Sequence, residues 1–230
     1  MATIGGANIV RNGLVLELDA ASKNSYPGTG TTWTDLSGNG NNGTLVSSPT
    51  FDNSNGGNIS IPSTVSYIDY GTAFTLGAGD FAIDVWFKNN TTNAGNRALI
   101  EKRGPSFTTG GWNLRSGSPT SVSWEQLTSG TYYNLTIGSI SGTSWYNVIL
   151  TRIGTTVTGY INGIAGGVQT GDSANYNYTS TSIRSGTDSS ANLSAGGDFS
   201  LGCVKIYKGA GLTQNQVLQN YNATKARFEL

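Results

Sequence analysis

The chain has 230 residues, of which 11% are charged, and its 13 basic residues balance 13 acidic ones. This balance excludes an overall electrostatic field that would attract nucleic acid or an anionic membrane surface, and the single cysteine excludes an intramolecular disulfide framework. No apolar run approaches the roughly 18 residues that a membrane-spanning helix needs, and residues 1–12 lack the apolar core of a signal peptide.

Period-two alternation of side chains predicts a series of strands through the first half of the chain. The clearest alternation covers Phe81–Lys88, which we interpret as a central strand with one face in the core. Clusters of Gly and Asn between the strands predict loops at 26–30, 36–43 and 52–58, because both residues tolerate a positive φ. The strands predicted here are Gly13–Asp19, Thr44–Val46, Ile59–Ile61, Ser66–Tyr70 and Phe81–Lys88.

The second half continues the same pattern. Asn162-Gly163 stands between two apolar runs and predicts a hairpin, because a type I′ turn needs a positive φ at both central positions. The following strand extends this meander to about Gln169. The other strands predicted in this half are Ala98–Lys102, Gly111–Leu114, Ser121–Gln126, Tyr132–Ile137, Trp145–Arg152, Val157–Ile161, Thr181–Arg184 and Phe199–Tyr207.

One helix is predicted, near the C-terminus. Thr213 and Gln216 have the spacing of a capping box, and Leu212 can staple against Val217. The helix should then present an apolar stripe, formed by Val217, Leu218 and Tyr221.

No internal repeat or linker divides the sequence, so we predict one domain over residues 1–230. It begins with an N-terminal arm at 1–12 and ends with a C-terminal helix and tail at 213–230. Many short strands separated by Gly- and Asn-rich turns predict an all-β fold, an antiparallel two-sheet sandwich.

Four segments resemble motifs of laminin-G-like domains in the concanavalin A-like superfamily. They lie in the order expected for that family and span nearly the whole chain: Asp35–Leu45, Phe81–Lys88, the stretch from Trp145 to Gly163, and Val204–Tyr207 followed by Leu212-Thr213. The resemblance implies a jelly-roll sandwich with a short C-terminal helix. It also implies that Trp86 and Trp145 pack inside the protein.

Within this family, the sequence is similar to stand-alone domains encoded by tailed bacteriophages. The similar stretches are Asn12–Ala20, Ser25–Ser37 and Leu218–Lys225. The resemblance implies a virion component that is assembled in the host cytoplasm. Its partners would be other capsid or tail proteins and further copies of itself, with host-surface glycans as an additional ligand, and it would engage neither nucleic acid nor membrane.

The first functional hypothesis is therefore a non-enzymatic bacteriophage virion protein that decorates the capsid or tail. The alternative is a free carbohydrate-binding, lectin-like module, and the third hypothesis is a glycan-cleaving enzyme. Glycan cleavage usually needs two flanking carboxylates, but Glu17-Leu18-Asp19 lacks the spacing of the glucanase motif and Glu101 and Glu125 stand apart. The chain also has no histidine to act as a general base, so we predict no enzyme.

Aromatic side chains with amides beside them are the candidates for sugar contacts, because sugars stack on aromatic faces and hydrogen-bond to amides. For each aromatic residue, packing in the core is the competing interpretation. The candidates are Trp33, Trp112, Asn113, Trp124, Gln126, Tyr132 and Tyr133. Five scattered basic residues are interpreted as solvated surface or subunit contacts rather than as an anion-binding site: Arg97, Lys102, Arg103, Arg115 and Arg152.

No cofactor is predicted, although calcium is weighed because many laminin-G-like domains hold one ion. Asp35 and Asn39 would supply oxygen ligands of the kind calcium prefers. However, relatives often carry two acidic residues where this chain has Gly202 and Cys203, so the resemblance does not imply a bound calcium ion here. We favour Asp35 as the cap of an Asx turn, and Cys203 as a buried thiol.

Overall fold

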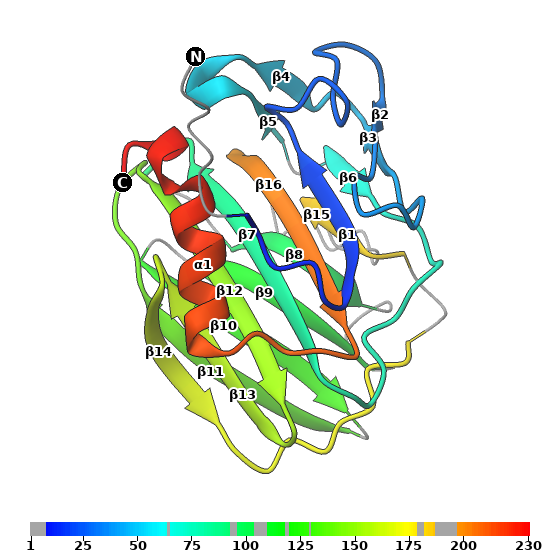
Figure 1. The fold of residues 1–230 in the computed structure, drawn as a ribbon, viewed down its shortest axis with the longest axis vertical. Coiled ribbons are helices and arrows are strands. Elements are labelled where there is room, and N and C mark those ends of the chain that lie inside the picture. The colour runs from blue at the N-terminus through cyan, green and yellow to red at the C-terminus, as the bar shows by residue number, and fades with distance from the viewer. Residues whose placement is uncertain are drawn as a thin grey trace.

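The computed structural model describes residues 8–63, 65–92, 96–103, 110–117, 120–128, 130–178, 182–186 and 197–230. Within these residues the chain folds into two packed antiparallel β-sheets with one short α-helix near the C-terminus (Figure 1). We call them the front and back sheets, after their positions in Figure 1. The predicted all-β, two-sheet jelly-roll sandwich is confirmed.

The front sheet has strand order β14-β13-β12-β7-β16-β5-β4, and β1 also pairs with β16. The back sheet has the order β11-β10-β9-β8-β15-β6-β3-β2. The front strands are β1 (Leu14–Asp19), β4 (Thr50–Asp52), β5 (Asn58–Ile61), β7 (Phe81–Asn89), β12 (Trp145–Ile153), β13 (Thr156–Ile161), β14 (Ile164–Gln169) and β16 (Phe199–Lys208). The back strands are β2 (Thr32–Trp33), β3 (Gly43–Val46), β6 (Tyr67–Asp69), β8 (Arg97–Arg103), β9 (Gly111–Gly117), β10 (Ser121–Thr128), β11 (Thr131–Ser139) and β15 (Arg184–Gly186).

The sequence missed the short strands β2 and β4 and the 3-10 turn η1 (Ser54–Gly56), which fall in stretches dominated by turn residues. The strand predicted at Thr181–Arg184 appears as β15, displaced toward the C-terminus, and Thr181 itself lies outside the described residues. Residues 1–7 of the predicted N-terminal arm also lie outside them. The hairpin at Asn162-Gly163 is confirmed, since φ is 51° and 78° at these two residues.

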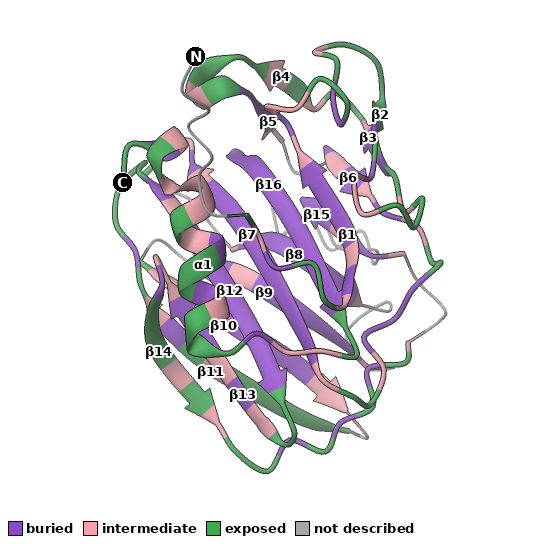
Figure 2. Ribbon diagram, in the orientation of Figure 1, coloured by how far each residue is buried: buried purple, intermediate pink, exposed green. Residues whose placement is uncertain are grey.

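Strand β7 is buried on both faces, although the sequence predicted only one. The alternate residues from Phe81 to Phe87 face the back sheet and form the main core. On the other face, Ala82, Asp84 and Trp86 are also fully buried, because the C-terminal segment covers the front sheet (Figure 2). Trp86 therefore packs under that segment rather than between the two sheets.

The C-terminal segment consists of α1 (Gln214–Thr224) and the 3-10 turn η3 (Lys225–Phe228). Thr213 and Gln216 form both hydrogen bonds of the predicted capping box, and Leu212 and Val217 share one buried cluster. The predicted apolar stripe is wrong at Leu218, which is 38% exposed. Asn220 is buried in the helix instead, because it belongs to a polar network on the front sheet.

The two sheets approach each other where β11 and β14 lie side by side (Figure 1). A Cβ atom added at Gly166 would lie 1.9 Å from the carbonyl oxygen of Ile137. One added at Gly167 would lie 2.1 Å from that of Thr136. Glycine at both positions thus permits this close backbone contact, which places the end of β14 beside the start of β11.

The back sheet also buries a cation. Lys102 is fully buried, and its ammonium donates one hydrogen bond to the carbonyl oxygen of Phe74 at 3.2 Å. Burial lowers the pKa of Lys102 to about 8. The sequence prediction that Lys102 is solvated is wrong, as it is for Arg97 and Arg152, which are 2% and 3% exposed.

Replacing Lys102 by Met should raise the free energy of unfolding at pH 7 by about 1–3 kcal/mol, because it removes a buried charge to which the described residues offer no carboxylate partner. In an unfolded chain the lysine pKa is about 10.4. The unfolded state therefore binds more protons than the folded state between pH 8 and about 10.4, and wild-type stability should gain from this group as pH rises through that window. Urea unfolding of both proteins from pH 7 to 10 measures the difference between their free energies of unfolding, which should become smaller at high pH. A difference that stays constant with pH would contradict this account.

Candidate functional site

A groove of about 780 Å³ opens between the β10–β11 turn and the extended segment 170–178. Its volume lies in the range of ligand-binding clefts. Most of its lining side chains are polar and uncharged; they include Gln126, Thr128, Thr131, Tyr133, Gln169, Thr170, Ser173, Asn175 and Tyr178.

One wall of the groove is the extended segment 171–176, in which exposed and buried residues alternate. Ser173 and Asn175 face outward, whereas Asp172, Ala174 and Tyr176 are buried. The backbone N–H of Tyr176 donates to Gly77 at 2.8 Å, which ties this wall to the chain entering β7. The result is an ordered wall that presents hydroxyl and amide groups to solvent.

Arg152 of β12 holds this wall from behind. Its guanidinium donates to the carbonyl oxygens of Ala174 at 2.7 Å, Asp172 at 3.0 Å and Gly154 at 3.1 Å. It also lies 3.6 Å from the carboxylate of Asp172. A buried planar cation with several fixed acceptors preorganises the segment, so Arg152 positions the wall rather than facing a ligand.

The base of the groove is built on Gln126. Its side-chain carbonyl accepts a hydrogen bond from the indole of Trp124 at 3.2 Å and contacts the hydroxyl of Tyr176. Burial raises the pKa of Tyr176 above its usual value, and the neighbouring charge of Asp172 raises it further. The tyrosine hydroxyl therefore stays protonated, and the indole N–H of Trp124 orients the amide of Gln126.

Tyr132 and Tyr133 point to opposite faces of β11, as successive residues of a strand must. Tyr133 is 43% exposed and lines the groove. Tyr132 is 51% exposed on the outer face of the back sheet, where its hydroxyl donates to Glu125 at 2.6 Å. Of the seven predicted sugar contacts, the groove brings together Gln126 and Tyr133.

The three tryptophans proposed as sugar contacts need correction. Trp33, Trp112 and Trp124 are fully buried, and the rings of Trp112 and Trp124 stack on each other at 5.5 Å. Their faces are used in the core, so they cannot stack on a ligand. Asn113 is 1% exposed on the opposite face of β9, away from the groove.

The sequence missed the polar residues of the groove walls, above all Ser173 and Asn175. No strand is predicted between Gln169 and Thr181, because Gly, Ser, Thr and Asn dominate that stretch. The alternation of Asp172, Ala174 and Tyr176 with small polar residues was the available indication of an ordered, half-buried segment.

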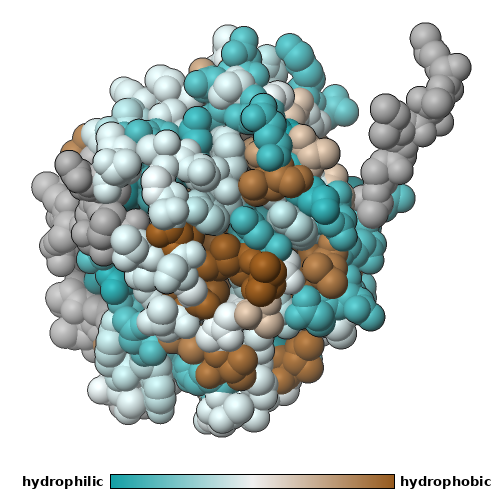
Figure 3. All heavy atoms as spheres, turned by 90° about the vertical axis from the view of Figure 1, so that its left-hand side faces the viewer, coloured by the Kyte–Doolittle hydropathy of each residue, from teal (hydrophilic) through white to brown (hydrophobic). Residues whose placement is uncertain are grey.

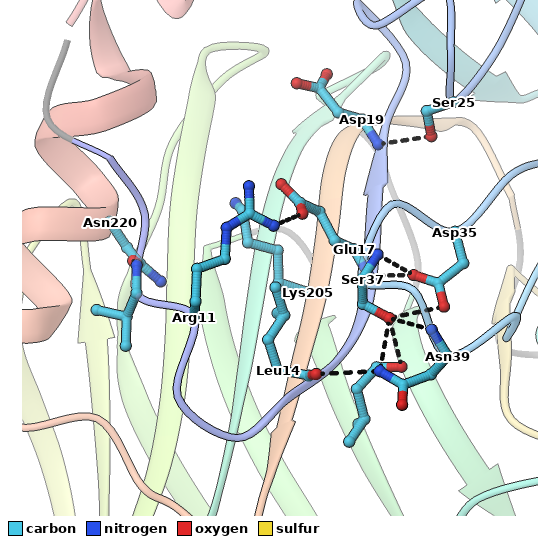
Figure 4. Close-up of polar contacts among 12 residues, drawn as sticks. Arg11, Leu14, Glu17, Asp19, Ser25, Asp35, Ser37, Asn39, Lys205 and Asn220 are labelled. Atoms are coloured by element: carbon cyan, nitrogen blue, oxygen red, sulfur yellow. Dashed lines mark hydrogen bonds and ion pairs between the residues drawn. The ribbon is translucent and has the colours of Figure 1, made fainter. Parts of the chain in front are cut away.

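The carboxylate of Asp35 is engaged in hydrogen bonds to its own loop and to β1 (Figure 4). It accepts hydrogen bonds from the backbone N–H groups of Glu17, Ser37 and Asn41 at 2.9–3.0 Å, and from the hydroxyl of Ser37 at 2.8 Å. The side chain of Asn39 donates to the carbonyl oxygen of Leu14 and to Ser37. Asp35 thus caps an Asx turn and fixes this loop against β1. The part of the chain that the structure describes contains no group of three or more acidic, Cys or His side chains that could hold a metal.

The acidic residues weighed for catalysis are engaged elsewhere. Glu17 pairs with Arg11, and Asp19 pairs with Arg227 at 2.5 Å. Glu101 and Glu125 do share one face of the back sheet, with Asn113 between them in the strand register.

Glu101 is 1% exposed and Glu125 is 6% exposed, so neither carboxylate is open to a substrate. Glu125 is also held by Arg115 at 2.5 Å and by Tyr132.

A separate apolar surface lies on the side of the molecule that carries α1 and β14 (Figure 3). Its large exposed side chains are Ile164 and Val168 of β14 and Leu218 of α1, which are 74%, 54% and 38% exposed. No helix among the described residues is long and apolar enough to cross a membrane.

Residues 53–218 match a family model described as the concanavalin A-like lectin/glucanases superfamily. No curated protein sequence matches the chain. Similar solved structures include the binding domain of Paraclostridial Mosquitocidal Protein 1, with 17% identity, a TM-score of 0.72, and coverage of 93% of this chain and 52% of that chain.

Two further structures come from botulinum neurotoxins. The serotype D binding domain has 15% identity and a TM-score of 0.69, and the match covers 92% of this chain and 52% of that chain. The binding domain of neurotoxin DC, solved in complex with SialylT, has 13% identity and a TM-score of 0.69, with coverage of 93% and 52%. The chain therefore spans about half the length of these structures, and the likeness is one of fold.

Proposed function

The chain belongs to the concanavalin A-like lectin/glucanase superfamily, and on that premise we propose that it is a non-enzymatic carbohydrate-binding module whose ligand lies in the groove beside Tyr133. One observation carries the proposal: the groove combines a half-exposed aromatic ring with a fixed polar wall that includes Ser173 and Asn175.

The chemistry of the groove suits a sugar. A pyranose has an apolar C–H face that packs on an aromatic ring such as Tyr133, and hydroxyl groups that both donate and accept hydrogen bonds. Thr131, Ser173 and Asn175 offer hydroxyl and amide groups, which likewise both donate and accept hydrogen bonds. Because Arg152 already fixes the wall, little conformational entropy is lost on binding.

The acidic residues support a binding role over catalysis. The carboxylates weighed for catalysis are in ion pairs or buried. Asp172, the one acidic residue among the described residues that line the groove, is buried against Arg152. The three similar solved structures described above are binding domains of other proteins, one of them in complex with SialylT. Since the match covers about half of each, we base the proposal on the groove itself.

Tyr133→Ala should weaken binding of any glycan that the protein recognises at least tenfold, because it removes the exposed aromatic surface. Tyr132→Ala is the matched control: it removes a neighbouring exposed tyrosine from the opposite face of the same strand and should leave affinity within about twofold. A glycan array followed by calorimetric titration of both variants makes the comparison.

Two results would count against the proposal. One is the absence of binding to every glycan class on the array. The other is binding that Tyr132→Ala abolishes and Tyr133→Ala leaves intact, which would move the site to the outer face of the back sheet.

The placement on a bacteriophage virion, with capsid or tail partners and self-association, stays a prediction. It rests on the sequence resemblance at Asn12–Ala20, Ser25–Ser37 and Leu218–Lys225. A carbohydrate-binding module is compatible with that setting, and the groove would act in the same way on a virion or free.

A further inference from the structure

We propose that the groove selects uncharged saccharides and discriminates against those bearing a carboxylate, such as sialylated or uronic-acid glycans. The inference rests on the proposed function, and it concerns which class of sugar the same groove accepts. It follows from the charges around the groove and from where each nearby cation is directed.

Asp172 is the one charged residue among the described residues that line the groove. Its side chain is buried, and its carboxylate accepts hydrogen bonds from the backbone N–H of Ala174 at 3.0 Å and from the hydroxyl of Tyr176 at 2.8 Å. With Arg152 at 3.6 Å, this carboxylate is already compensated. The Asp172 carboxylate therefore needs no cation from a ligand. The pair that it forms with Arg152 also has no positive charge left over for a ligand anion.

Three cations of the neighbouring strands have their charge directed elsewhere. Arg152 directs its donors to carbonyl oxygens behind the wall and is 3% exposed. Lys102 is fully buried and donates to Phe74. Arg115 projects from the opposite face of the back sheet and pairs with Glu125 at 2.5 Å.

A sugar carboxylate in this groove would therefore lose hydration without gaining a cationic partner. Burying an anion without such compensation is unfavourable, whereas a neutral hydroxyl exchanges water for hydroxyl and amide partners at little net cost. Thr131, Ser173 and Asn175 supply those neutral partners. The groove thus favours a hydroxyl-rich, uncharged ligand.

The test compares matched pairs of glycans that differ at the carboxylate, such as sialylated N-acetyllactosamine and its carboxyl-reduced form, and a uronate oligomer and the corresponding neutral hexose oligomer. Calorimetry on the full chain should give affinities at least tenfold lower for the acidic member of each pair that binds. Binding of the neutral member should change by less than about twofold between 50 and 500 mM salt, because no ion pair forms.

A charge placed on the wall sharpens the test. Ser173→Lys should reduce the discrimination against the acidic member at least threefold, since it puts an ammonium beside the ligand. The matched control is Thr143→Lys, at an exposed position in the turn beyond the far end of β11, which should leave the discrimination unchanged.

The outcomes separate the two proposals. If the acidic member binds as tightly as the neutral one and Tyr133→Ala weakens both, the selection for uncharged sugars is wrong and the glycan-binding groove stands. If Ser173→Lys leaves the discrimination unaltered, the charge argument is wrong. If neither member of any pair binds, the proposed function itself fails.

Discussion

Asp84→Ala should lower the free energy of unfolding by about 3–5 kcal/mol, because it leaves the buried ammonium of Lys205 without its carboxylate partner. Asp84 lies in the middle of β7 and is fully buried under α1. Its carboxylate accepts hydrogen bonds from Asn147 at 2.7 Å, Asn220 at 3.1 Å and the ammonium of Lys205 at 3.4 Å. Burial lowers the pKa of Lys205, but the charge of Asp84 and those of neighbouring groups together outweigh it, and the net pKa is raised. Urea unfolding at pH 7 measures the loss.

The matched control is the double variant Asp84→Ala/Lys205→Met, which removes both charges together. It should recover a large part of the loss, giving a coupling energy above about 1.5 kcal/mol in the double-mutant cycle. A loss below about 1 kcal/mol in the single variant, or a double variant less stable than the sum of the singles, would show that the pair does not hold the C-terminal helix as described.

Phe228→Ala should cost about 3–5 kcal/mol of stability, the usual range for deleting a buried aromatic ring. The ring of Phe228 is 3% exposed and stacks on Trp86 at 4.3 Å between centroids, with Trp145 at 4.5 Å. Its removal opens a cavity above the front sheet and exposes both indoles. Their fluorescence emission should therefore shift to longer wavelength in the folded protein.

The matched control for this position is Leu230→Ala, two residues away and 44% exposed, which should change stability by less than about 0.5 kcal/mol. Equal effects at the two positions would mean that the end of the chain contributes little to the fold. An unchanged emission maximum in Phe228→Ala would contradict the packing of Phe228 over Trp86 and Trp145.

The features that the sequence predicted well depend on local patterns. The alternation in Phe81–Lys88 located β7, Asn162-Gly163 located a turn with two positive φ angles, and Thr213 with Gln216 located the start of α1. In each case neighbouring residues determine the backbone conformation, so no knowledge of distant contacts was needed.

The features that it missed depend on which distant segment covers a given face. Period two assigns Asp84 and Trp86 to one side of β7, but it does not reveal that α1 and η3 bury that side. Similarly, composition marks Trp112 and Trp124 as aromatic candidates, whereas their burial follows from the opposing sheet. The groove joins Tyr133 to Ser173 and Asn175, which are distant in the sequence, through a tertiary arrangement that local patterns do not specify.

The most direct test of the central claim is an amide NMR titration of the full chain with a neutral oligosaccharide that binds on the array. The account predicts saturable shift changes concentrated at Thr131, Tyr133, Gln169, Ser173 and Asn175, with a dissociation constant that matches calorimetry. Saturable changes confined to Tyr132, Asn134 and the outer face of the back sheet would contradict it.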